Sequence, residues 1–304
     1  MLRVEMLENN DLLQALIQRS ERLAANHIGE KGLVNGFDEI TAMLSTHDPS
    51  PSPILHAIDQ KGQDFGTYFF AAYSETRDLG RSIQVYRTVK ALVRYILLMD
   101  RHYEVGNKRY FRMAKALLKT VKEDHESGHV RYSIDFSFKQ FWPFWDFEQK
   151  MKQLMLSGYT FSFKEIRYHN LFKSSDAPII YARVLDNELP NFNQNVSTVL
   201  HYNQALQDLL DDLYDIEEDL IDLMPNFFIL AALDEIPLEK LARSPHNVRK
   251  QVISNGATGA IMPLVEEYGK QVREIELPAN YRFLKHLSSF YVKELRRSMN
   301  GLKR

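Results

Sequence analysis

Six aspartates lie close together in residues 207–222, whose sequence is QDLLDDLYDIEEDLID. In a helix, five of them would follow one another at steps of four and three residues and form one continuous stripe. The stripe consists of Asp208, Asp212, Asp215, Asp219 and Asp222, and Asp211 lies beside it. Aspartate is a weak helix former and like charges one turn apart repel, so this run costs roughly 3 kcal/mol or more, with no Lys or Arg inside it. Bound divalent cations would relieve the repulsion, and Mg²⁺ prefers carboxylate oxygens and keeps positions open for water and phosphate. We therefore predict a Mg²⁺ site on this helix.

The alternative is a solvated helix face, which is the commoner role of an acidic run. Here, however, a row of apolar residues runs beside the aspartates and predicts that the helix is anchored in a core. The row consists of Leu206, Leu209, Leu213, Ile216, Leu220 and Leu223. A half-buried helix that uses Asp in place of Glu favours the metal site over the solvated face. On this view, replacing one of the aspartates by alanine should leave the fold intact or slightly stabilise it, because repulsion is removed.

The run Asp211-Asp212-Leu213-Tyr214-Asp215 resembles DDxxD, the second aspartate-rich motif of trans-isoprenyl diphosphate synthases and, more widely, of class I terpene synthases. Upstream, Lys173-Ser174 is similar to the Lys-Thr pair of that family, and residues 256–297 look like its closing helices. The resemblance covers roughly residues 170–297. It implies an all-α fold of the isoprenoid-synthase type and several Mg²⁺ ions that bridge to a prenyl diphosphate. The implied metal ligands are Asp211, Asp212 and Asp215, with Asp208 and Asp219 beside them, and the implied substrate contacts are Lys173 and Gln207.

Members of this family also carry a first acidic motif on an earlier helix. The nearest match here is Asp100 with Glu104, which are one helical turn apart and would complete the metal site. Arg87, Lys90 and Arg94 lie at helical spacing before Asp100 and are predicted to share the charge of the diphosphate, with a solvated stripe as the alternative. The glycine-lysine segment that follows the second motif in chain-elongating members is absent. This favours ionisation followed by cyclisation or rearrangement over chain elongation.

Charge is unevenly distributed along the chain, although the net charge is only −2. Residues 184–239 contain thirteen acids and no Lys or Arg, so the rest of the chain is basic, which suits a site that holds an anion through bridging metal ions. No basic patch with interleaved aromatic residues is present, so nucleic-acid binding is not expected. The chain has no cysteine, which excludes disulfides and thiolate ligands. We find no signal-peptide pattern and no apolar stretch of membrane-spanning length, and therefore expect a cytoplasmic protein without a transmembrane segment.

Helical periodicity dominates the chain and predicts an all-α, single-domain bundle. The predicted helices cover residues 11–26, 79–103, 108–124, 141–155, 177–185, 196–224, 227–233, 245–254, 259–275 and 281–295. The glycines of residues 29–36 are expected to break the first helix, and the prolines of residues 47–53 predict a loop. Alternating aromatic and polar residues at 132–138 and 159–163 predict a small β-ribbon.

Two other patterns, a possible zinc motif and an aromatic cluster, also have plainer structural explanations. Residues 125–129 fit the H-E-x-x-H pattern of zinc proteases, but Gly128 within them favours a polar turn. The aromatic residues of 136–147 offer a surface for a carbocation, although a plain core or a dimer face is the commoner role.

The prediction from the sequence is thus a Mg²⁺-dependent enzyme that ionises a prenyl diphosphate. Two alternatives stay open, a chain-elongating isoprenyl diphosphate synthase and a non-catalytic helical regulatory subunit with a degenerate site. The oligomeric state is open as well, with a homodimer among the assemblies that fit.

Overall fold

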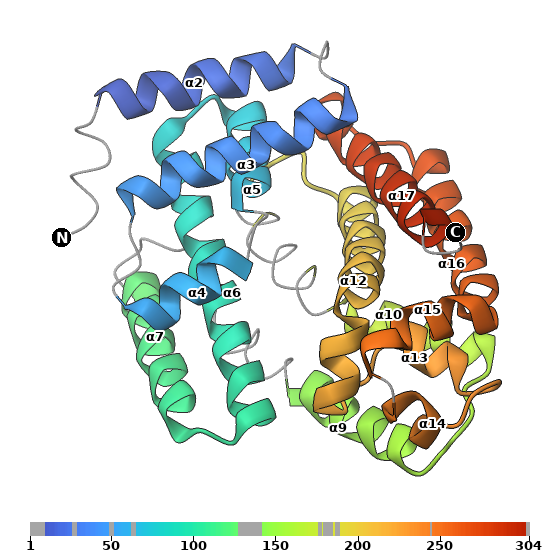
Figure 1. Cartoon of the computed structure of the whole chain (residues 1–304). Coiled ribbons are helices and arrows are strands. Elements are labelled where there is room, and N and C mark those ends of the chain that lie inside the picture. The colour runs from blue at the N-terminus through green and yellow to red at the C-terminus, as the bar shows by residue number, and fades with distance from the viewer. Residues whose placement is uncertain are drawn as a thin grey trace. The chain divides into compact units, whose positions relative to one another are not determined.

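The computed structural model describes residues 10–25, 29–48, 52–61, 65–126, 142–175, 189–243 and 245–301, together with Pro178 and Leu185. All regular structure in these residues is helical, which confirms the all-α class. The helices form two compact units (Figure 1). The first is built mainly from residues 1–139, and the second from residues 140–178, 195–277 and 284–304. The single-domain organisation expected from the sequence stays a prediction.

The described residues of the first unit form six α-helices and one short 3-10 turn. They are α2 (Asn10–Ala24), α3 (Glu30–His47), α4 (Pro53–Lys61), α5 (Phe65–Thr76), α6 (Leu79–Val105), α7 (Lys108–Glu126) and η3 (Ala279–Tyr281). Residues 65–73 of α5 are all buried, so this helix forms the centre of the unit. The side chain of Asp78 caps α6, which ends at Gly106 in the left-handed conformation (φ 70°) and turns into α7 beside it (Figure 1).

Glycine has a packing role in this unit. The first helix, α2, ends before the predicted break at residues 29–36, but residues 30–36 are themselves helical and begin α3. α3 runs through Gly36, where an added Cβ would lie 2.4 Å from Leu23 of α2. At Gly66 of α5, a Cβ would lie 2.1 Å from the carbonyl oxygen of Phe37. The absence of a side chain therefore lets three helices approach closely.

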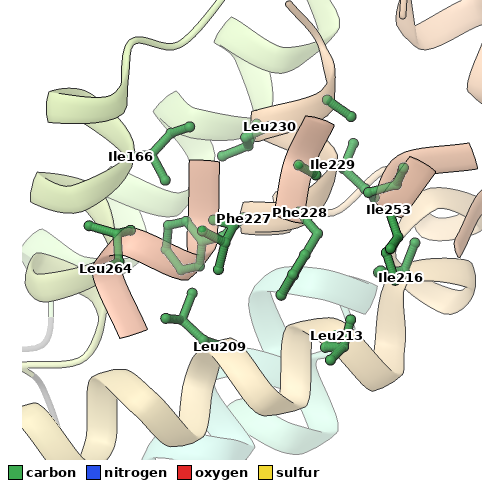
Figure 2. Packing of buried hydrophobic residues seen from close by; sticks show 14 of the residues in the cluster. Ile166, Leu209, Leu213, Ile216, Phe227, Phe228, Ile229, Leu230, Ile253 and Leu264 are labelled. Carbon is green, nitrogen blue, oxygen red and sulfur yellow. The ribbon is translucent and has the colours of Figure 1, made fainter. Parts of the chain in front are cut away.

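The second unit contains the acidic helix and a deeply buried core. Its elements are α9 (Trp142–Leu156), α10 (Phe163–Lys173), α12 (Gln194–Asp222), α13 (Phe227–Ala232), α14 (Leu238–Ala242), η1 (Pro245–Asn247), α15 (Val248–Val252), η2 (Ile253–Ala257), α16 (Thr258–Glu274) and α17 (Phe283–Gly301). Figure 2 shows side chains of α13, Phe227 to Leu230, gathered with Leu209 and Leu213 of α12, Ile166 of α10 and Leu264 of α16. The apolar row predicted on α12 is confirmed as far as Leu220, and Leu223 lies in the turn beyond the helix with φ 54°.

The predicted β-ribbon is wrong in its second half. Residues 159–162 are irregular, and Phe163 begins α10. Ser162 and Glu165 form a capping box, in which Ser162 Oγ accepts from the Glu165 N–H and the Glu165 carboxylate accepts from the Ser162 N–H. This local helix start outweighs the aromatic alternation that suggested a strand. Three predictions lie outside the described residues: the strand at residues 132–138, the helix at 177–185 apart from Pro178 and Leu185, and the part of the H-E-x-x-H pattern after Glu126.

Among the described helices, none is both long and apolar enough to cross a membrane.

Candidate acidic site on helix α12

The aspartates of α12 are not equivalent once the helix is packed. Asp212 is 6% exposed, Asp208 and Asp219 are half-buried, and Asp211 and Asp215 are exposed. Asp208, Asp212 and Asp219 thus form an inner group, which we call the carboxylate cluster. Each of its members has partners from α10, from α12 itself or from the start of α13.

Lys173, the last residue of α10, brings the cluster its positive charge. Its Nζ lies 3.7 Å from Asp212 Oδ1 and 4.0 Å from Glu148 Oε1 of α9. The ammonium group also lies 5.7 Å from the centre of the Phe227 ring, within the range of a cation–π contact. None of the helices predicted from the sequence contains Lys173, whereas the structure places it at the end of α10.

Asp208 is held by neutral donors. Ser174 Oγ donates to Asp208 Oδ2 at 2.5 Å, and Gln204 Nε2 donates to Asp208 Oδ1 at 2.8 Å. Behind Ser174 lies the fully buried Asn170, whose Nδ2 donates to Ser174 Oγ at 3.5 Å and to the carbonyl oxygen of Ala205 at 3.4 Å. The amide oxygen of Asn170 has no hydrogen-bond partner among the described residues.

Asp212 and Asp219 anchor the turn between α12 and α13. Asp212 Oδ2 accepts from the N–H of Phe227 at 2.7 Å. Asn226 Nδ2 donates to the carbonyl oxygen of Asp212 at 2.6 Å and to Asp219 Oδ2 at 2.8 Å. Asn226 Oδ1 in turn accepts from the N–H groups of Phe228 and Ile229, so Asn226 is the N-cap of α13.

The electrostatics of the cluster show an excess of negative charge. Burial raises the pKa values of Asp208 and Asp212 above their ordinary range, and it raises the pKa of Asp219 to about 7. For Lys173, burial alone would lower the pKa, but the carboxylates of Asp212, Glu148, Asp208 and Asp219 outweigh it and raise the pKa above its ordinary value. Burial is thus the largest cause of the raised aspartate pKa values, whereas the raised pKa of Lys173 reflects the negative charge of the carboxylates around it.

The donor groups fit Mg²⁺ in type and in charge. Carboxylate oxygens are hard ligands, and Asn170, which donates to Ser174, also carries a buried amide oxygen without a hydrogen-bond partner. As they lie, however, the carboxylates are turned toward Lys173 and toward hydrogen-bond donors. Within the described part of the chain, no three Asp, Glu or His side chains are grouped so that they could hold a metal ion. Binding of Mg²⁺ through Asp212 would therefore have to compete with Lys173.

Two other predicted substrate contacts are buried in ion pairs of the first unit. Lys90 Nζ donates to the carbonyl oxygen of Asp48 at 2.9 Å, to its carboxylate at 3.1 Å and to Tyr86 Oη at 3.0 Å. Arg94 donates through Nε and Nη2 to both carboxylate oxygens of Asp59, at 2.7 and 2.6 Å. The Lys90 side chain is 2% exposed, so the alternative of a solvated stripe is wrong. Both cations hold α4 and the end of α3 on α6, and a contact of either with diphosphate stays a prediction.

The remaining predicted residues do not join the cluster through any described contact. Gln207 accepts a hydrogen bond from Tyr291 of α17 at 3.5 Å. Arg87, Asp100 and Glu104 lie on α6 in the first unit, and the side chain of Glu104 is outside the described residues. A role for them in the site stays a prediction.

The aromatic side chains of α9 pack on α10. Phe144 and Phe147 lie 4.9 and 4.6 Å, ring centre to ring centre, from Phe172, and Trp142 meets Trp145 edge to face at 5.6 Å. These contacts support the plain packing role, although Phe172 directly precedes Lys173. Residues 136–141 lie outside the described residues.

Four residues at the cluster were not predicted from the sequence: Gln204, Ser174 as a hydrogen-bond donor to Asp208, Glu148 and Asn226. Gln204 was detectable, since it lies one helical turn before Asp208 and such pairs interact on a helix. Asn226, followed by the apolar residues 227–233, was detectable as an N-cap. Glu148 carries no local signal, because its contact with Lys173 depends on how α9 packs on α10.

Comparison with protein-family models, with curated proteins and with solved structures gave no match.

Proposed function

We propose that this protein is a Mg²⁺-dependent enzyme that binds a prenyl diphosphate at the carboxylate cluster and ionises it, with cyclisation or rearrangement of the prenyl chain. The observation that supports this most is the 3.7 Å approach of Lys173 to Asp212. The resemblance predicts these two residues, from separate helices, for one diphosphate site, and the chain folds so that they meet. The fold assignment to the isoprenoid-synthase type and the cytoplasmic location belong to the same proposal.

The chemistry divides between the metal and the side chains of this chain. When bound, Mg²⁺ would act as a Lewis acid on the departing diphosphate. Asp212, with the exposed Asp211 and Asp215, would hold the metal, and Asp208 and Asp219 would keep the local potential negative. Lys173 would donate to a diphosphate oxygen and share its charge.

A non-catalytic role is the second candidate, and one observation favours it. Apart from Lys173, the described partners of the carboxylate cluster are neutral donors that connect the end of α10, α12 and the start of α13. A regulatory subunit could keep such a polar core for its structural value alone. Chain elongation is the third candidate, which the missing glycine-lysine segment disfavours.

Incubation with prenyl diphosphates of several chain lengths, with and without Mg²⁺, separates these functions. We expect diphosphate release that requires Mg²⁺, is lost in Asp212→Asn and is kept in the control Asp222→Asn, which alters an exposed carboxylate at the end of the same helix. A longer product that forms only with a five-carbon diphosphate co-substrate would show elongation. Absence of release from every substrate, together with no binding of diphosphate, would favour the non-catalytic role.

A further inference from the structure

An exposed apolar turn connects α9 to α10 (Figure 1). Large apolar side chains that are 38–48% exposed gather on residues 154–163, and they are Leu154, Leu156, Tyr159 and Phe163. We call these four the apolar tip. Exposed apolar residues that cluster in this way usually mark a site of interaction. The tip therefore needs a partner whose chemistry fits it.

The turn has a fixed backbone, which holds the tip in place. The N–H of Tyr159 donates to the carbonyl oxygen of Leu154 at 3.1 Å. The N–H of Gly158, whose φ is 74°, donates to the carbonyl oxygen of Met155 at 3.1 Å. These two bonds form a Schellman motif, in which the residue after the glycine lies beside the residue whose carbonyl it bonds. Leu154 and Tyr159 therefore belong to one surface.

The core beneath the turn is filled by other side chains. Met155, Phe161 and Ile166 are at most 5% exposed and belong to the core of the second unit. Phe161 directly precedes the N-cap Ser162, and with Ile166 in the first turns of α10 it has the positions of a hydrophobic staple. The residues of the apolar tip are thus not required for this packing and stay at the surface.

The surroundings of the tip are cationic. Residues 149–164 contain three lysines and no Asp or Glu, in a chain whose net charge is −2. Lys150 and Lys164 are exposed, and the third lysine is Lys152. The next acid along the chain, Glu165, is held in the capping box. An apolar surface with a rim of lysines complements a membrane that contains anionic lipid, where apolar groups enter below the headgroups and lysines meet the phosphates.

The size of the tip favours a lipid surface over a second protein. With roughly 150–250 Å² for each large side chain, the exposed fractions give the tip about 250–400 Å². A stable protein interface needs about 800 Å² on each partner. Shallow insertion of a few apolar side chains into the headgroup region has no such requirement.

We propose that the apolar tip inserts into the headgroup region of a membrane that contains anionic phospholipid, with Lys150 and Lys164 at the lipid phosphates. Peripheral binding of this kind requires no membrane-spanning helix. The inference goes beyond the proposed function, which concerns the carboxylate cluster, and it does not depend on that function.

The test is sedimentation of the protein with vesicles of phosphatidylcholine mixed with phosphatidylserine. We expect wild type to bind, and Leu156→Ser/Phe163→Ser to bind about tenfold more weakly, because affinity scales with the apolar area that enters the lipid. Val105→Ser is the matched control, since Val105 is 61% exposed and ends α6 in the first unit. It should bind like wild type. No binding by wild type, or an equal loss in Val105→Ser, would overturn the proposal.

The lysine rim is tested by the lipid charge. Lys150→Gln/Lys164→Gln should bind the mixed vesicles about tenfold more weakly, because each lysine near an anionic surface adds to the attraction. Lys270→Gln, which removes an exposed lysine of α16, is the control and should bind like wild type. Equal effects of the two variants would contradict a specific role of the rim.

Leu156→Trp tests insertion without removing apolar surface. Its fluorescence, compared with that of wild type, should shift to the blue on the mixed vesicles, because the indole enters a less polar region. Absence of this shift would contradict insertion. Self-association of wild type that is lost in Leu156→Ser/Phe163→Ser, without vesicle binding, would assign the tip to a second copy and overturn the proposal. None of these measurements uses a prenyl diphosphate, so their outcome is separate from that of the proposed enzyme.

Discussion

Replacement of Asp212 by alanine should destabilise the fold, contrary to what repulsion along the helix alone predicts. The Asp212 side chain is 8% exposed and accepts from the N–H of Phe227 at 2.7 Å, while Lys173 lies 3.7 Å from its other oxygen. Loss of a hydrogen bond to a charged group costs about 1.5–3 kcal/mol. Leaving a buried charge without its partner costs about 3–5 kcal/mol, but a third of the Lys173 side chain reaches water, so most of that second cost is recovered. We expect a total loss of about 2–4 kcal/mol.

Asp211→Ala is the matched control, since it removes an exposed carboxylate from the adjacent position of the same helix. Its free energy of unfolding should stay within about 0.5 kcal/mol of wild type, or rise slightly because repulsion is relieved. Urea unfolding followed by circular dichroism gives both values, provided that the slope of the transition does not change. Adding Lys173→Met to Asp212→Ala should recover part of the loss, because the two residues share one interaction.

An Asp212→Ala protein that unfolds at the same urea concentration as Asp211→Ala would refute this reasoning. It would mean that the contact with Phe227 contributes no net stability, and that α12 tolerates loss of Asp212 as the sequence alone suggested.

Three further predictions concern ligands, packing and pH. Mg²⁺ with inorganic diphosphate should raise the melting temperature more than either alone, and the absence of any shift at millimolar concentrations would favour the non-catalytic role. Gly66→Ala should lower stability by about 1–3 kcal/mol, since its Cβ would meet the carbonyl oxygen of Phe37, whereas Gly259→Ala in open space should be neutral or stabilising in the same thermal assay. Hydrogen bonds from Ser162 and Tyr159 lower the pKa of Glu165 to about 2, below its ordinary 4.5. Its stabilising contribution is therefore complete above pH 4.5 and is lost as pH falls toward 2; NMR titration should show the low pKa in wild type and an upward shift in Ser162→Ala.

Local sequence patterns were sufficient to predict many of the helices. The helices predicted at residues 79–103, 108–124 and 141–155 correspond to α6, α7 and α9 within two residues at each end. Periodicity, caps and turn glycines act over a few residues, so the chain carries those signals in order. The apolar row of α12 was predictable for the same reason, because helix geometry alone places its residues on one face.

Helices whose formation depends on neighbours were not predictable in this way. α3 crosses Gly36 because Leu23 of another helix fills the space where a side chain would be. α10 begins at Phe163, the last residue of a predicted strand, because the capping box of Ser162 and Glu165 competes with an alternating aromatic pattern. A local pattern reports one preference, whereas the fold selects among several.

The candidate site likewise has some features that follow from local sequence and others that depend on tertiary structure. The sequence by itself determined that the aspartates of α12 form a stripe, and its resemblance to a known family implied that Lys173 contacts the same diphosphate. Only the tertiary structure decided that Asp212 is buried between Lys173 and Phe227 while Asp211 stays exposed. It also decided that Lys90 donates to Asp48, which is distant in sequence. Burial and pairing of a charge depend on which other helices come to lie beside it, and helix periodicity contains no information about those neighbours.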